Sequence, residues 1–309
     1  LTIVEEANEL IERVRGGGVL PMITSCSPGW VKFCEHYYPD LIPNLSTCKS
    51  PQQMFGAVTK SYYAEVMGIP ADRIVSVSVM PCTAKKHELG RDDQGQDGYQ
   101  DVDFSITTRE LAKMIRLAGI EFMKLEDEPY DNPLGEYTGA GVIFGATGGV
   151  MEAALRTAVE KLTGDELINL DFVDVRGVKG VKEAEYDLQG QKVKVAVASG
   201  LANARVILDK VKAGEADYTF IEIMGCPGGC VNGGGQPHVD SQIRNFMDVR
   251  AERAKGLYTL DKNAPIRKSH ENPVIVKMYE DYFGVPGGEK AHHLLHTTYV
   301  DRVVNVQVD

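Results

Sequence analysis

Four of the chain's six cysteines lie in three short loops that are far apart in sequence. Cys26, Cys82, Cys226 and Cys230 share a surrounding of glycine, proline, methionine or lysine, in loops that span residues 24–30, 80–86 and 224–237. Thiolates select zinc, copper(I) or iron–sulfur clusters, and four cysteine thiolates are the commonest cluster ligation. Cys82, Cys226 and Cys230, with one residue of the first loop, therefore predict a single soft-metal centre.

Two other interpretations of the cysteines stay open at this point. A structural zinc site usually has short paired CxxC knuckles, and the sequence contains none. A single cysteine is often a small buried hydrophobe, which is how we interpret Cys34, whereas Cys48 could be either structural or functional. The many glycines near Cys230 favour a functional loop, because they let the backbone approach a bulky inorganic group closely.

The segments before these loops must position the thiols. Short apolar runs at residues 19–24, 74–79 and 218–223 indicate strands, the first of them buried, and each ends at a cysteine loop. A further strand is expected at 192–199, and helices at 3–14, 51–66 and 148–161. Strands that alternate with helices predict an α/β fold of two lobes, each a mainly parallel sheet flanked by helices. Ligands gather at the carboxyl ends of such strands, so the centre is expected in the cleft between the lobes.

Composition excludes several classes of function. The formal net charge of −11 argues against a nucleic-acid partner, since phosphate binding needs clustered lysine and arginine. No run of 18 apolar residues occurs, so no membrane span is expected. Six cysteines in 309 residues do not form the dense framework of small secreted domains, and reduced thiols predict a cytoplasmic protein.

The first predicted helix carries acidic residues that could move protons. Glu6, Glu9 and Arg13 are spaced to share one helix face. Carboxylates in such a row can relay a proton, although a solvated helix face gives the same pattern. The sequence alone leaves both interpretations open.

The cysteine loops resemble the signature segments of the iron-iron (FeFe) hydrogenases. The second and third family patterns, Met-Pro-Cys-x-x-Lys-x-x-Glu and Met-x-Cys-x-x-Gly-Cys-x-x-Gly-Gly-Gly-x-Pro, are matched in full. Further matching segments, at residues 50–54, 107–111, 144–152 and 269–272, extend the resemblance over nearly the whole chain. The resemblance implies reversible reduction of protons to H2 at an H-cluster. This cofactor is a 4Fe-4S cubane bridged by one cysteine to a diiron unit with CO, cyanide and an azadithiolate.

The resemblance also implies roles for individual residues. Cys82, Cys226 and Cys230 would ligate the cubane, Cys230 would bridge to the diiron unit, and Lys85 would pair with a cyanide ligand. The pocket wall around the diiron unit is expected to comprise Pro51, Gln52, Met80, Phe144 and Met224. The implied proton path runs through Glu6, Ser46, Glu9 and Cys26.

The first loop departs from the family pattern. The family has two adjacent cysteines, whereas this chain has Cys26 followed by Ser27. Ser27 then occupies the position of the fourth cubane ligand, unless the register shifts and Cys26 ligates. An alkoxide is harder than a thiolate and suits iron–sulfur chemistry less well.

The resemblance predicts a domain division and partners. Residues 1–135 would form the first lobe and 136–309 the second, without the family's N-terminal strand and accessory ferredoxin-like modules. Electrons are expected from ferredoxin, an NAD(P)-linked route or another electron-transfer subunit, and maturation proteins would insert the diiron unit. The alternatives are a hydrogenase-like iron–sulfur assembly protein without H2 turnover and an H2 sensor. The joint presence of Lys85, Met224, Cys26 and Glu9 favours the enzyme.

Overall fold

A four-stranded sheet forms the centre of the structure, a computed structural model that describes residues 1–24, 26–188 and 190–303. Its strands lie in the order β1 (Met22–Ile23), β6 (Phe220–Met224), β5 (Gln191–Ser199) and β4 (Val181–Leu188). β1 and β5 both pair with β6 in parallel, and β4 pairs with β5 antiparallel. The sheet is thus mainly parallel, as expected.

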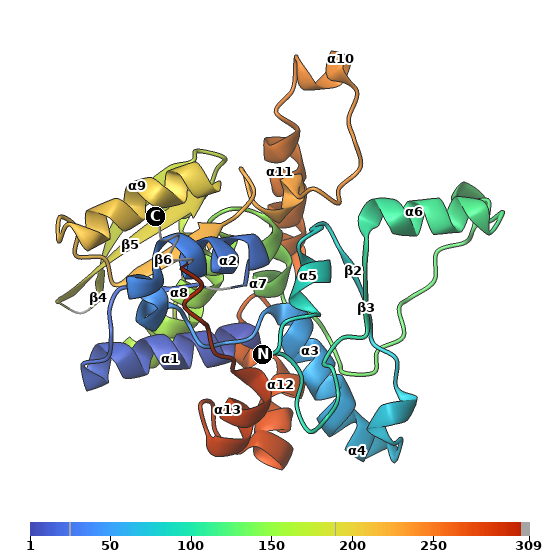
Figure 1. Ribbon diagram of the computed structural model, residues 1–309, viewed down its shortest axis with the longest axis horizontal. Helices are drawn as coiled ribbons and strands as arrows, with labels where there is room; N and C mark the ends of the chain where they lie inside the picture. The colour runs from blue at the N-terminus through green and yellow to red at the C-terminus, as the bar shows by residue number, and fades with distance from the viewer. Residues whose placement is uncertain (25, 189, 304–309) are drawn as a thin grey trace, which may run out of the picture.

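A second, two-stranded sheet lies beside the first. β2 (Val77–Met80) and β3 (Phe104–Thr107) pair in parallel, and β3 leads into α6 (Thr108–Leu117), which projects from the body of the molecule (Figure 1). α6 begins with a capping box, in which the Thr107 side chain accepts a hydrogen bond from the backbone N–H of Glu110. The two parallel sheets with flanking helices confirm the predicted α/β fold class.

Helices cover both faces of the larger sheet. On one face, α1 (Thr2–Gly16) and α8 (Gly149–Thr163) share a core with Val195 and Val197 of β5 (Figure 1). On the other, α2 (Pro28–Tyr37) and α9 (Leu201–Lys212) pack against Ala196 and Ala198 of the same strand. This alternation along β5 follows from the two-residue period of a strand, and it explains why the strand is apolar on both faces over residues 195–198.

The remaining helices lie at the upper end, at the lower end and near the middle of the molecule (Figure 1). They are α3 (Pro51–Val58), α4 (Ala64–Met67), α5 (Lys85–Glu88), α7 (Gly139–Val142), α10 (Ser241–Arg244), α11 (Val249–Asn263), α12 (Pro273–Met278) and α13 (Glu289–Leu295). A third core forms where α1, α3, α12 and α13 meet.

Two expected elements differ from those observed. The strand expected at 19–24 is reduced to β1, because Val19 and Leu20 are solvent-exposed and precede a cis Leu20–Pro21 bond. The helix expected over 51–66 is interrupted by a π-helical turn at Thr59–Tyr63. Strand β4 was not predicted, because its alternating charged residues are typical of an exposed edge.

The lobe division at residue 135 stays a prediction. α1 and β1, from the first of these ranges, pack against α8 and β6 from the second. Among the described residues, no helix combines the length and the apolar character needed to cross a membrane.

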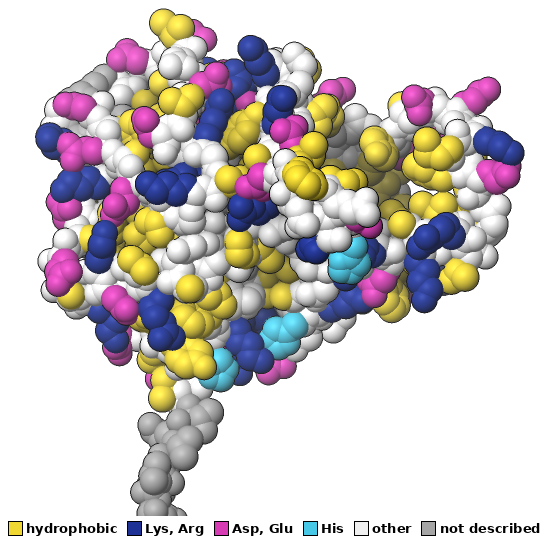
Figure 2. Space-filling model, turned by 90° about the horizontal axis from the view of Figure 1, so that it is seen from above, with side chains coloured by type: hydrophobic (Ala, Val, Ile, Leu, Met, Phe, Trp, Pro, Cys, Tyr) yellow, Lys and Arg dark blue, Asp and Glu magenta, His cyan; other side chains and the backbone are white. Residues whose placement is uncertain are grey.

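The face seen in Figure 2 mixes acidic, basic and hydrophobic side chains, and a hollow separates the projecting α6 from the body. This hollow has a volume of about 850 Å3 and lies between α6 and the segment Pro237–His238. It contains no cysteine among its described lining residues.

Candidate metal centre

The three cysteine loops converge on one cavity of about 280 Å3. Cys26 follows β1, Cys82 follows β2, and Cys226 follows β6, so three strands, each paired in parallel within its own sheet, deliver thiols from their carboxyl ends. Every residue expected to bind iron or to form the cofactor pocket lines this cavity: Cys26, Ser27, Pro51, Gln52, Met80, Cys82, Lys85, Phe144, Met224, Cys226 and Cys230. Loops that are distant in sequence thus come together as the spacing predicted.

Burial favours the protonated form of three thiols of this cavity, those of Cys26, Cys226 and Cys230. Burial, followed by the nearby Cys82, raises the pKa of Cys230 to about 11, and the same two causes raise the pKa of Cys226. Burial also raises the pKa of Cys26, although the nearby Lys85 opposes the shift. A bound metal would reverse this order, because coordination deprotonates a thiol outright.

Lys85 is held at the cavity by a carboxylate beneath it. Its Nζ donates hydrogen bonds to the carbonyl oxygen of Cys26 at 2.7 Å and to Glu88 Oε1 at 2.9 Å. Glu88 also accepts hydrogen bonds from Ser50 Oγ at 2.8 Å and Gln52 Nε2 at 2.6 Å. Glu88 therefore fixes an ammonium and an amide of the cavity wall at once.

We expect Glu88→Gln to destabilise the fold by about 3 kcal/mol, because it leaves the ammonium of Lys85 buried without a counter-charge. The two side chains are only 10% and 7% exposed. Denaturant unfolding would measure the loss. Glu110→Gln is the matched control, since its pair with Lys86 is 44–45% exposed and its loss should destabilise the fold much less. Equal losses in the two variants would contradict the structural role of Glu88.

The wall of the cavity fits an inorganic cluster. Gln52 Oε1 is buried and has no hydrogen-bond partner among the described residues. A Cβ on Gly233 would lie 2.2 Å from the carbonyl oxygen of Pro81, and one on Gly229 would lie 2.6 Å from the backbone nitrogen of Thr147. Glycine at these positions lets the two loops close around the cavity, and the orphaned amide oxygen leaves an acceptor beside it.

The first loop presents both of its candidate ligands. Cys26 and Ser27 each line the cavity, and Ser27 is also the N-cap residue of α2 without a side-chain capping bond. A Cβ on Gly225 would lie 2.8 Å from Ser27 Oγ, so the serine hydroxyl faces the Cys226 loop. The preceding residue, Ser25, lies outside the described residues. The choice between Ser27 and Cys26 as fourth ligand stays a prediction.

The acidic residues of α1 continue from this cavity toward the surface. Glu9, whose side chain is 13% exposed, accepts hydrogen bonds from Ser46 Oγ at 2.9 Å and from Arg13 at 2.6 Å. Glu6 is buried and, with Cys26, lines a second, very small cavity of about 10 Å3, the space of about one water molecule. From the surface inward, the order is therefore Glu9, Ser46, Glu6 and Cys26, which exchanges the two glutamates of the implied path Glu6, Ser46, Glu9 and Cys26.

Glu6 should make the stability of the protein depend on pH. Burial, with repulsion from Glu9 and Glu222, raises the pKa of Glu6 from 4.5 to about 8, despite a hydrogen bond from Ser46. The folded chain then holds this proton more tightly than the unfolded chain. Its contribution to the free energy of unfolding is complete below pH 4.5 and is lost as the pH rises to about 8.

Because glutamine does not titrate, the stability of Glu6→Gln relative to the parent should increase across this pH window and then level off. Denaturant unfolding at a series of pH values would measure it. The control is Glu12→Gln, an exposed position on the same helix. A stability difference that is constant with pH would show that Glu6 titrates normally.

Sequence reasoning missed a buried carboxylate that holds the cavity wall. Glu222 lies in the middle of β6 and accepts hydrogen bonds from the backbone nitrogens of Gly148 at 2.6 Å and Met151 at 2.7 Å. These groups belong to the start of α8, next to Phe144 of the wall. The signal was present in the sequence, because a single acidic residue interrupts an otherwise apolar strand.

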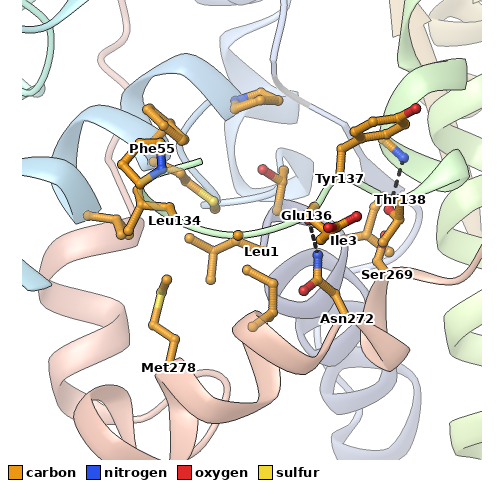
Figure 3. A pocket seen from close by; sticks show the side chains of 18 of the residues that line it. Leu1, Ile3, Phe55, Leu134, Glu136, Tyr137, Thr138, Ser269, Asn272 and Met278 are labelled. Carbon is orange, nitrogen blue, oxygen red and sulfur yellow. Dashed lines mark hydrogen bonds between the residues drawn. The ribbon is translucent and has the colours of Figure 1, made fainter. Parts of the chain in front are cut away.

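A larger cavity of about 480 Å3 adjoins the thiol cavity and shares Pro51, Gly141 and Phe144 with it. Figure 3 shows its apolar side chains, among them Leu134 and Met278, and the hydrogen bond from Asn272 Nδ2 to the carbonyl oxygen of Glu136 at 2.6 Å. Its described lining includes no cysteine, histidine or lysine. Of these two adjoining cavities, only the thiol cavity has cysteines among its described lining residues.

Comparison with known proteins identifies the family. The sequence profile described as "Iron only hydrogenase large subunit, C-terminal domain" matches residues 1–234. This chain belongs to that family. A second hydrogenase profile, "Iron hydrogenase small subunit", matches residues 247–302 of the chain. The resemblance inferred from the cysteine loops is confirmed.

Two individual relatives are also named as hydrogenases. The chain is 50% identical over 299 residues to iron hydrogenase 1 of Clostridium pasteurianum, which covers 97% of this chain and 52% of the relative. It is also 50% identical over 308 residues to an NADP-reducing hydrogenase subunit of Solidesulfovibrio fructosivorans, with coverage of 98% and 52%. The chain spans about half the length of these curated relatives.

A solved hydrogenase structure supports the fold, and a more distant relative is named as an iron–sulfur assembly protein. An apo FeFe-hydrogenase variant of Chlamydomonas reinhardtii superposes with a TM-score of 0.84 at 43% identity, covering 98% of this chain and 82% of the other. The cytosolic iron-sulfur assembly component 3 of Bos taurus is 32% identical over 309 residues, with coverage of 96% and 63%. Identity is thus higher to the hydrogenases than to the assembly protein.

Proposed function

We propose that this chain forms the H-cluster domain of an iron-iron hydrogenase that interconverts protons and H2. The observation that carries the proposal is the convergence of Cys82, Cys226, Cys230, Lys85 and Met224 on one cavity. Thiolates there suit a 4Fe-4S cubane, and a buried ammonium suits an anionic cyanide ligand. When bound, the H-cluster supplies the electron transfer and the hydrogen-activating chemistry.

The protein's own residues would bind the cluster, shield it from water and deliver protons to it. Cys82, Cys226 and Cys230 would hold the cubane, and Cys230 would also hold the diiron unit. Lys85, fixed by Glu88, would donate a charge-assisted hydrogen bond toward that unit. The pocket wall consists of side chains that exclude water and make few hydrogen bonds: Pro51, Gln52, Met80, Phe144 and Met224.

Protons reach the cavity through four side chains in series. Glu9 takes up a proton at the partly exposed end, Ser46 passes it on, and Glu6 holds it beside the small cavity that it shares with Cys26. The raised pKa of Glu6, about 8, lets this carboxyl both hold and release a proton near neutral pH. The Cys26 thiol then donates to the thiol cavity.

Infrared spectroscopy of the purified protein, after maturation with the diiron unit, tests the proposal. CO and cyanide stretching bands together with H2 turnover are the expected result. Iron and sulfide without those bands would support the alternative, an iron–sulfur assembly protein that holds only the cubane. Bands with only slow turnover would indicate an H2 sensor.

Electron partners and location follow from the same proposal. The name of the Solidesulfovibrio relative makes an NADP-linked route one candidate, and ferredoxin or another electron-transfer subunit is the other. Maturation proteins would supply the diiron unit, and the cytoplasmic location inferred from the reduced thiols stays a prediction.

The fourth cubane ligand can be tested directly. If Ser27 is that ligand, Ser27→Cys should make the cubane more resistant to chelators, because a thiolate binds iron of a cluster better than an alkoxide does. The rate of cluster loss in excess chelator measures this. If Cys26 ligates instead, Ser27→Cys should alter proton transfer as well. Identical behaviour of variant and parent would mean that neither residue binds iron.

A further inference from the structure

A second group of metal-ligating side chains lies between α1 and the end of α13, outside the thiol cavity. A carboxylate oxygen of Glu9, Sγ of Cys48 and a ring nitrogen of His296 lie within 4.8 Å of one another. Cys48 is 3% exposed and His296 is 7% exposed. We propose that these three side chains bind a divalent metal ion of the zinc type.

The backbone holds two of the three ligands opposite each other. Cys48 and His296 form an isolated antiparallel β-bridge, flanked by hydrogen bonds from Lys49 N to Leu295 O at 2.8 Å and from Thr297 N to Thr47 O at 2.7 Å. Residues directly opposite in an antiparallel pair place their side chains on the same face. The thiol and the imidazole are thus positioned before any metal binds.

The distances suit a zinc ion. Zinc bonds of about 2.0–2.3 Å in a tetrahedral arrangement place the ligand atoms roughly 3.3–3.7 Å apart. Cys48 Sγ and Glu9 Oε2 are 3.7 Å apart. A three-residue set of sulfur, nitrogen and oxygen leaves a fourth position for water, as in zinc sites that are not fully closed.

A second carboxylate orients the imidazole as in known metal sites. Nε2 of His296 lies 3.1 Å from Glu5 Oε2. Glu5 is itself held by the hydroxyl of Tyr279 and by the backbone nitrogen of Gly287. Metal-ligating histidines almost always donate their other N–H to such a group. Nδ1, which now faces Thr47 Oγ1 at 2.7 Å, is then the nitrogen for the metal.

The charges balance when the ion is present. Glu5 and Glu9 contribute two negative charges, a Cys48 thiolate contributes a third, and Arg13 contributes one positive charge at 2.6 Å from Glu9. A divalent ion brings the sum to zero. The other buried acidic group, formed by Glu152, Asp171 and Asp261, is instead neutralised by three arginines: Arg156, Arg176 and Arg267.

An ion at this site would affect the proton path, a consequence that rests on the proposed function. Coordination occupies the Glu9 carboxylate, which otherwise accepts a hydrogen bond from Ser46. The exposed His292 ring stacks on His296 at 4.6 Å, so the site lies just beneath the surface. Zinc can therefore reach Glu9 from outside and block proton entry.

Zinc binding to the protein with its iron–sulfur cluster in place tests the site, because the cluster then occupies the other thiols. After loosely bound metal is removed, the parent should retain one zinc ion more per chain than Cys48→Ala. Cys34→Ala, a buried thiol at another place, should behave as the parent. Glu5→Gln should weaken zinc binding by about 10–100-fold.

The zinc K-edge X-ray absorption spectrum should show one sulfur neighbour with nitrogen and oxygen. Equal zinc content in the parent and Cys48→Ala, or a shell of sulfur alone, would overturn the site.

Measuring H2 turnover with and without zinc distinguishes the metal site itself from its proposed effect on the proton path. Zinc should slow turnover of the parent and of Cys34→Ala, and leave Cys48→Ala unaffected. If zinc binds as described but turnover does not change, the metal site stands and the role of Glu9 in proton transfer is wrong. If Cys48→Ala is inhibited like the parent, zinc acts elsewhere and the proposed consequence is wrong.

Discussion

Cys230→Ala should abolish H2 turnover and prevent retention of the diiron unit. Cys230 lines the thiol cavity and is the proposed single bridge between the cubane and that unit. Its removal deletes a ligand that no other described side chain of the cavity can replace from the same position, since Cys226 and Cys82 are assigned to the cubane. Infrared spectroscopy after maturation would measure the loss as missing CO and cyanide bands.

The matched control is Cys34→Ala, which removes a buried thiol from the packing between α2 and the larger sheet. That variant should keep its infrared bands and its turnover, with a modest loss of stability. Normal CO bands in Cys230→Ala would show that the bridge is another residue. Lost bands in both variants would mean that the effect reports on folding.

The sequence predicted the centre better than it predicted the elements around it. Cys82, Cys226 and Cys230 could be grouped because thiols beside glycines and prolines have few purely structural uses, and a strand precedes each loop. The exact strand ends could not be predicted in this way. β1 is short because Val19 and Leu20 lie in solvent, and an apolar run does not reveal which of its residues will be buried.

The residues that hold the site in place were harder to predict. Glu88 was visible as part of a motif, but its contacts with Ser50 and Gln52 join segments more than 35 residues apart. The same holds for Cys48 and His296, which are 248 positions apart and become neighbours only through a backbone bridge. Such contacts depend on the tertiary fold, and a single sequence gives local pattern but not pairing.

The order of the proton path also came from the structure. Helical spacing placed Glu6 and Glu9 on one face, and the order implied by the resemblance put Glu9, rather than Glu6, next to Cys26. In the structure, Glu6 is buried beside Cys26, and Glu9 is paired with Arg13 near the surface. A raised pKa at the inner carboxyl, about 8 for Glu6, and a partly exposed outer carboxyl are suited to a relay that works near neutral pH.

The proton path predicts that Glu6→Gln, Glu9→Gln and Cys26→Ala should each lower H2 turnover by orders of magnitude. Each variant removes one titratable group and leaves the thiols of Cys82, Cys226 and Cys230 in place, so the infrared bands should persist. Each tenfold loss corresponds to about 1.4 kcal/mol of added barrier. Glu12→Gln, on an exposed part of the same helix, is the control and should turn over at the parent rate.

Double variants make the test sharper, because a path in series is already blocked by one missing group. Glu6→Gln combined with Cys26→Ala should therefore lose little more activity than either variant alone, as expected of residues that act as a unit. If the losses of activity in the single variants multiply in the double variant, the two residues act on the cavity independently. Unchanged turnover in Glu9→Gln would leave the glutamates of α1 with a structural role alone. Because Glu6 is buried and Glu9 is hydrogen-bonded to Ser46, the relay predicts non-additivity for each pair along this line.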